Sequence, residues 1–81
     1  MLDTEKNRKL TKKQQMVLEC LSYFIEENGY SPTYQELAEL LESDVHSVFS
    51  KMLVLQEKGY VRCINGKART FQVIMEYDKR N

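Results

Sequence analysis

The chain has 81 residues, a hydrophobic fraction of 42%, and 12 basic against 12 acidic residues, so its formal net charge is zero. So short a chain forms one small core and has too little surface to enclose a catalytic cleft, which argues against an enzyme. Two cysteines and one histidine make neither a disulfide framework nor a four-ligand zinc site, and we expect no metal and no other cofactor. The sequence contains neither an apolar run of the ~20 residues that a membrane span needs nor a signal-peptide core, so we expect a cytoplasmic protein without contact to a membrane.

The charges are unevenly distributed along the chain. The first 13 residues carry a net charge of +3, residues 14–57 carry −7, and the last 24 residues return to +4. Two basic ends could bind one anionic partner, whereas the acidic middle could face another protein. Composition leaves both possibilities open.

The first predicted element is a helix over residues 12–28. Residues 1–9 are polar and without periodicity, and we interpret them as a flexible arm. Thr11 and Gln14 have the spacing of a capping box, in which each side chain accepts a hydrogen bond from the other residue's backbone N–H. Apolar residues then recur at helical spacing, and Gly29 offers the left-handed residue that commonly ends a helix.

A tight connection and a shorter helix follow. Pro32 favours extended geometry in the residue before it, and Thr33 with Glu36 makes a second capping box. The apolar stripe that comes next lasts only about two to three turns. We therefore expect a short second helix that stops near residue 42.

The third predicted helix runs from a cap at Ser43 or Asp44 to Lys58, with Gly59 after its end. At 100° per residue its apolar side chains fall within an arc of about 160°, the width of a core-facing stripe. We expect this stripe, including its aromatic residue, to lie in the core. Its members are Val45, Val48, Phe49, Met52, Leu53 and Leu55.

The opposite face of this helix is small and polar. Its members are His46, Ser47, Ser50 and Lys51. A helix pair joined by a short turn, whose second member has such a face, is typical of a helix-turn-helix, because bulky outer side chains would keep the helix out of a major groove. Phe49 lies at the edge of the apolar arc, where a contact with a partner protein or with a thymine methyl group is the alternative to the core.

The period of the pattern then changes from 3.6 to about 2. In residues 61–64 and 70–73 every second residue is a candidate for the inward face, namely Val61, Cys63, Phe71 and Val73. Asn65-Gly66 between the two runs is a strong hairpin signal. Lys67 and Arg69 lie at or beside the tip of this hairpin, where they can meet a phosphate or simply aid solubility.

The order of elements predicts a mainly α fold with a small β-hairpin. Three helices followed by a two-stranded antiparallel wing make a winged helix-turn-helix domain over residues 10–74, and residues 75–81 form a tail. Cys20 and Cys63 stand in apolar patterns and are expected to pack against the core.

Four stretches closely resemble the DNA-binding domain of the LexA repressor family. They recur in the family's order and at nearly its spacing, as LTKKQQ (10–15), GYSPT (29–33), ELA (36–38) and LQEKGYV (55–61). The resemblance covers residues 10–74. The sequence ends at Asn81, before any self-cleaving peptidase domain of that family, and it leaves open whether this is one domain of a longer chain or a small relative.

The resemblance implies that the third helix enters the major groove and that the wing lies along the phosphate backbone. By position, His46, Ser47 and Ser50 fall where the family reads bases, Lys51 is adjacent, and Arg69 matches the wing arginine. The start of the second helix would add phosphate contacts. The candidate DNA-binding residues are therefore His46, Ser47, Ser50, Lys51, Asn65, Lys67, Arg69, Thr33 and Tyr34.

The expected function is sequence-specific binding of double-stranded DNA by a bacterial or phage repressor similar to those of the SOS response. With about four phosphate contacts the salt dependence is modest, and one copy alone would bind DNA too weakly. We therefore expect a dimer, formed on DNA or through a domain absent here. The alternative is a protein-interaction module that binds another regulator or a polymerase subunit through its acidic face or the Val45 and Phe49 edge. Zero net charge favours this alternative, whereas the basic wing and the four stretches favour DNA.

Overall fold

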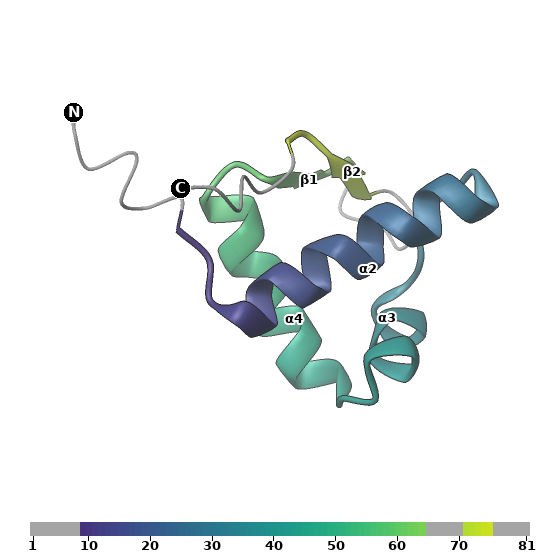
Figure 1. The fold of residues 1–81 in the computed structure, drawn as a ribbon, viewed down its shortest axis with the longest axis horizontal. Coiled ribbons are helices and arrows are strands. Elements are labelled where there is room, and N and C mark those ends of the chain that lie inside the picture. The colour runs from purple at the N-terminus through teal and green to yellow at the C-terminus, as the bar shows by residue number, and fades with distance from the viewer. Residues whose placement is uncertain (1–8, 65–70, 76–81) are drawn as a thin grey trace.

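The structure is a computed structural model that describes residues 9–64 and 71–75. Within them the elements in chain order are α2 (Lys12–Asn28), α3 (Tyr34–Leu41), α4 (Val45–Glu57), β1 (Val61–Cys63) and β2 (Phe71–Val73) (Figure 1). The two strands pair antiparallel. Three helices and a two-stranded sheet confirm the predicted fold, which is that of a winged helix-turn-helix. The arm and the tail expected at the two ends lie almost wholly outside the described residues.

Each helix begins at the cap that the sequence indicates. The Thr11 hydroxyl accepts from the Gln14 N–H at 3.1 Å, and the Gln14 side chain accepts from the Thr11 N–H at 3.0 Å. Thr33 and Glu36 repeat this capping box at the start of α3, with the same two distances. For α4 the cap is Asp44, whose carboxylate accepts from the Ser47 N–H at 3.3 Å. The entry of every helix is therefore fixed by side chains within one turn of it.

The helix ends use left-handed residues, and one of these is not a glycine. Gly29 follows α2 with φ 79°, and Gly59 follows α4 with φ 85°. At the end of α3 the left-handed residue is Glu42, with φ 54°. The Ser43 N–H then donates to the Ala38 carbonyl at 2.9 Å, which closes the Schellman pattern of a helix C-terminus.

The core lies between the three helices and the inner face of the sheet. Helix α2 packs on both α3 and α4, α3 packs on α4, and the strands close the far end, β1 against α4 and β2 against α2 (Figure 1). The buried hydrophobic residues of the core are Leu10, Val17, Leu18, Leu21, Leu37, Ala38, Val48, Met52, Leu55, Tyr60, Val61 and Phe71. Cys20 and Cys63 are half-buried against this cluster, as expected, and burial raises the pKa of the Cys20 thiol.

The expectation that the whole apolar arc of α4 is core is wrong for three residues. Val48, Met52 and Leu55 are almost completely buried. Val45, Phe49 and Leu53, by contrast, are 41%, 42% and 45% exposed. The buried three span only about 60° of the helix circumference at 100° per residue, because short neighbours can cover only a narrow strip. The other three form a separate line on the surface.

The sheet is short and is tied to the loop before α3. Cys63 pairs with Phe71 and Val61 with Val73, so the inward residues are apolar and the outward pair is polar, as the alternation predicts. The Phe71 N–H donates at 3.2 Å to the hydroxyl of Ser31, the one buried polar residue described. Residues 65–70, and with them the Asn65-Gly66 turn, lie outside the described residues.

Candidate nucleic-acid interface

The exposed face of α4 carries a polar centre made by His46 and Ser50. Both residues are exposed, and they lie about 40° apart around the helix, opposite the buried Met52. On one flank of this centre are the half-buried Ser47 and Lys51, and the Lys51 ammonium donates to the Ser47 hydroxyl at 2.6 Å. The structure therefore brings together the four candidates that the sequence places on this helix.

The other flank of the polar centre is a line of apolar side chains, which we call the apolar row. It consists of Val45, Phe49 and Leu53, at successive turns of α4. Sequence reasoning assigned these residues to the core. The signal that could have separated them is the width of the arc, since an arc of about 160° is wider than the neighbours of one helix in so small a domain can cover.

Tyr34 joins this face to the wing strand. Its ring meets the ring of Phe49 edge to face, with centroids 5.2 Å apart, and meets Phe71 of β2 at 5.1 Å. Such edge contacts are the favoured geometry of aromatic pairs. Burial, and after it the electrostatic interaction with Cys63, raises the pKa of the Tyr34 hydroxyl. As arranged here, Tyr34 holds α4 and β2 in a fixed relation.

Thr33 is already occupied as a cap. Its N–H donates to the Glu36 carboxylate at 3.0 Å, and its hydroxyl accepts from the Glu36 N–H. A phosphate at the start of α3 would therefore have to bind through the next amides, those of Tyr34 and Gln35, and would meet the charge of Glu36. The role of Thr33 and Tyr34 as phosphate contacts stays a prediction.

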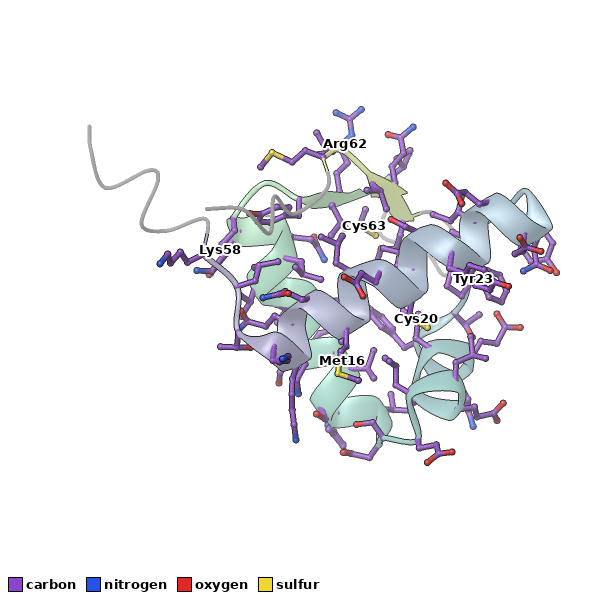
Figure 2. The ribbon with its side chains drawn as sticks, in the orientation of Figure 1. Met16, Cys20, Tyr23, Lys58, Arg62 and Cys63 are labelled. Carbon is purple, nitrogen blue, oxygen red and sulfur yellow. The ribbon has the colours of Figure 1, made fainter. Side chains whose placement is uncertain are left out.

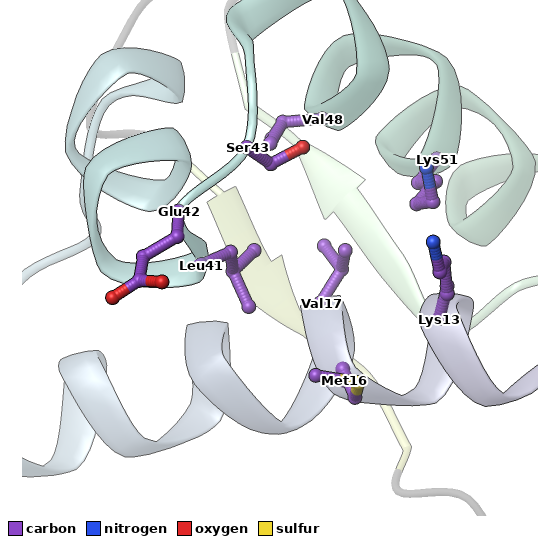
Figure 3. A pocket seen from close by; sticks show the side chains of 8 residues that line it. All are labelled: Lys13, Met16, Val17, Leu41, Glu42, Ser43, Val48 and Lys51. Carbon is purple, nitrogen blue, oxygen red and sulfur yellow. The ribbon is translucent and has the colours of Figure 1, made fainter.

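A basic residue that the sequence did not single out lies beside Lys51. Figure 3 shows Lys13 rising from α2 toward Lys51 of α4, at the edge of an open pocket of about 150 Å³ between α2, α4 and the end of α3. The lining is Lys13, Met16, Val17, Leu41, Glu42, Ser43, Val48 and Lys51. Lys51, the one basic residue of the acidic middle segment, therefore has a cationic neighbour contributed from a distant part of the chain.

The wing candidates Asn65, Lys67 and Arg69 lie outside the described residues. On the described part of the wing, Arg62 is exposed on the outward face of the sheet, away from the core (Figure 2). Lys58, at the end of α4, donates from its ammonium to the carbonyl of Lys9 at 3.0 Å.

The described part of the chain contains neither a cluster of metal ligands nor a membrane-spanning helix. Among residues 9–64 and 71–75, no three side chains of His, Cys, Asp or Glu gather as metal ligands would. In the same residues, none of the helices combines the length and apolarity that crossing a membrane requires.

Comparison with known proteins places most of the chain in one protein family. Residues 7–70 match the family model described as the LexA DNA binding domain. The chain belongs to that family. The match covers α2 to α4 and β1, and it includes every candidate residue from Thr33 to Arg69.

Relatives with the LexA architecture are longer than this chain. The LexA repressor of Thermotoga petrophila is 36% identical over 64 residues, which are 79% of this chain and 32% of that protein. The LexA repressor of Thermotoga neapolitana is 35% identical over 71 residues, or 88% and 36% of the two chains. That of Alcanivorax borkumensis is 33% identical over 67 residues, or 82% and 33%.

The chain thus spans about a third of the length of the LexA repressors that it matches. The family is described as a DNA-binding domain, and the proteins matched here are named repressors. The resemblance noted in the sequence is confirmed.

Proposed function

We propose that this LexA-family domain binds double-stranded DNA at a preferred sequence and represses transcription by occupying it. In this proposal α4 lies in the major groove and the wing lies along the phosphate backbone. The observation that carries it is the polar centre of α4, where His46 and Ser50 are exposed side by side on the helix that follows the short turn. A helix so placed in a helix-turn-helix is the one that reads base edges.

The side chains at this centre suit base reading. A major groove about 12 Å wide admits an α-helix, and each base pair presents a distinct pattern of donors and acceptors there. The imidazole of His46 and the hydroxyl of Ser50 can both donate and accept. Neither is long enough to hold the helix backbone away from the groove.

The cations on the flank suit phosphates. The Lys51 ammonium has three donors and gives one of them to Ser47, so two remain to meet an anion. Lys13 adds a second ammonium from α2 next to it. Contacts of this kind fix the position of a protein on the duplex without reading sequence.

The affinity of one copy is expected to be low, because the protein is neutral overall and makes few phosphate contacts. Four contacts give a slope of about −3.6 for log K against log salt concentration. A second copy on an adjacent half-site would raise the occupancy, and we propose that repression uses such a pair. SOS-type regulation stays part of this proposal.

The test is to select, from a library of random duplexes, those that the 81-residue protein binds. We expect one sequence, or two half-sites of it, to be enriched and to bind with a negative salt slope. Equal binding to all duplexes at low salt, with no enrichment, would contradict sequence-specific recognition. The absence of any salt-dependent binding would instead favour the protein-interaction module, with the exposed apolar row as its binding surface.

A further inference from the structure

We propose that the apolar row of α4, with Phe49 at its centre, reads the 5-methyl groups of thymines in the major groove. This inference rests on the proposed function, because it assigns a further specificity to the same helix. For Phe49 it takes up the thymine contact that the sequence left open as the alternative to a place in the core.

The fold leaves the apolar row uncovered. Val45, Phe49 and Leu53 each keep more than two fifths of their surface exposed, although the same helix buries Val48 and Met52 almost completely. Exposed apolar side chains occur singly on many surfaces, but a line over three turns of one helix is a patch. Packing within the described residues therefore explains only part of this row, chiefly through the contact of Phe49 with Tyr34.

The row borders the polar centre on the same face. At 100° per residue, Phe49 lies about 60° from His46 around the helix axis, and Leu53 lies about 20° from it. A groove that receives His46 and Ser50 therefore also receives at least part of the row. The partner must offer polar groups to the centre and apolar groups to its flank at once.

The major groove offers this combination. Its base edges carry hydrogen-bond donors and acceptors, and its apolar feature is the methyl group at C5 of each thymine. Aromatic and small apolar side chains are known to contact that methyl group. The apolar row thus matches adjacent thymines on the side of the groove that Phe49 faces.

The ring of Phe49 already packs against Tyr34 in the protein without DNA. Tyr34 holds it by an edge contact, with ring centroids 5.2 Å apart, and Tyr34 is itself packed on Phe71. A side chain held in this way loses less conformational entropy on binding than a free one. The contact with Tyr34 therefore favours selective recognition by Phe49.

A second copy of the chain fits the row less well. Three half-exposed side chains offer a few hundred Å² at most, whereas a stable protein interface buries about 800 Å² on each partner. The rest of the α4 face is polar, with the exposed Glu57 toward its end. The area is sufficient for methyl contacts in a groove but small for a dimer.

The experiment uses the most enriched duplex from the selection and derivatives in which one thymidine at a time is replaced by deoxyuridine. This replacement removes only the 5-methyl group. For the wild-type protein we expect Kd to rise about three- to fivefold at one or more positions, the factor that corresponds to burying one methyl-sized group. Phe49→Ala should bind the thymidine and deoxyuridine duplexes equally at the position that Phe49 contacts.

Leu40→Ala is the matched control, because Leu40 is an apolar residue 58% exposed on α3, outside the row. It should keep the full thymidine preference. Phe49→Leu is the second variant in case the alanine variant fails to fold, and it should keep a reduced preference. Thermal unfolding followed by circular dichroism verifies the fold of each variant.

Two results would overturn the inference while leaving the proposed function intact. One is an enriched duplex whose affinity is unchanged by deoxyuridine at every position. The other is a Phe49→Ala protein that folds and keeps the same thymidine preference as wild type. If the row instead holds two copies together, sedimentation will show a dimer that Phe49→Ala dissociates, without any methyl effect. A selection that enriches no duplex removes the proposed function itself, and this inference with it.

Discussion

Glu42 occupies a backbone position that suits glycine. Its φ of 54° is the left-handed value that side chains rarely adopt, and its N–H donates to the carbonyls that end α3. A left-handed residue other than glycine carries about 1–2 kcal/mol of steric strain, of which part is offset by the greater freedom of glycine in the unfolded chain. The turn between α3 and α4 is therefore less stable than its hydrogen bonds suggest.

We expect Glu42→Gly to raise the free energy of unfolding by about 0.5–1 kcal/mol, measured by urea denaturation. Glu39→Gly is the matched control, since Glu39 is exposed within the same helix and has ordinary helical geometry. That control should lose about 1 kcal/mol. A lower urea midpoint for Glu42→Gly than for wild type would show that the left-handed backbone is not strained.

His46 is the residue whose change should alter sequence preference without altering the fold. It is exposed at the polar centre of α4, so its removal opens no cavity. We expect His46→Ala to cost about 1–3 kcal/mol at the base that His46 contacts, and to move the melting temperature little. A repeat of the duplex selection with this variant provides the measurement. The same enriched sequence at the same affinity as wild type would remove His46 from the reading surface.

At the scale of the helix, local chemistry was sufficient to predict the elements. A capping box joins residues three apart, so Thr11 with Gln14 and Thr33 with Glu36 could be recognised before any tertiary contact is known. The glycines at helix ends act equally locally. This is why α2, α3 and α4 follow from the sequence. The two strands follow from another local signal, the period of about 2 in residues 61–64 and 70–73.

Properties that depend on neighbouring elements could not be predicted in the same way. The exposure of Phe49 depends on how much of α4 the eight-residue α3 and the three-residue strands can cover. The approach of Lys13 to Lys51 depends on how α2 crosses α4. A helical wheel contains neither quantity. It predicts the polar part of the candidate interface, and the width of its apolar arc indicates that some apolar residues stay uncovered, but it identifies neither which of them are exposed nor the part that α2 contributes.

The two faces of α4 should respond differently to truncation. Leu55 is fully buried, and Leu55→Ala should lower the free energy of unfolding by about 2–5 kcal/mol. Phe49→Ala should lower it by only about 1–2 kcal/mol, because the ring is 42% exposed and loses chiefly its contact with Tyr34. Urea denaturation of both variants checks the difference. Losses of equal size would mean that the row packs in solution.

The whole molecule concentrates its basic residues at the two ends of the sequence and its acidic residues between them. The fold brings Lys13 of α2, from the basic first segment, to the same pocket as Lys51, the one basic residue of the acidic segment. Two positive charges therefore lie together at this edge of the molecule. Net charge therefore understates the attraction that a phosphate backbone would meet at this edge. Long-range electrostatic attraction between the neutral protein and DNA should be weak. The slope of log K against log salt concentration should therefore depend mainly on direct contacts with phosphates.

For the wing, we expect Arg69→Ala to weaken random and preferred duplexes by the same factor and to make the salt slope shallower by about 0.9. Titrations at several salt concentrations measure both effects. Glu27→Ala, an exposed change near the end of α2, is the control and should leave the slope unchanged. A loss confined to the preferred duplex would assign Arg69 to base reading instead of phosphate binding.

The chain of rings from Phe49 through Tyr34 to Phe71 has a spectroscopic consequence. The protons of Tyr34 lie in the ring-current fields of two phenylalanines, one on α4 and one on β2. Any rotation of the Phe49 ring will therefore shift the Tyr34 resonances, even when no ligand atom approaches Tyr34 itself. With five tyrosines and no tryptophan in the sequence, an aromatic NMR spectrum should be sparse enough to follow this one residue. Tyr34 thus serves as a built-in reporter of events on the helix and on the wing.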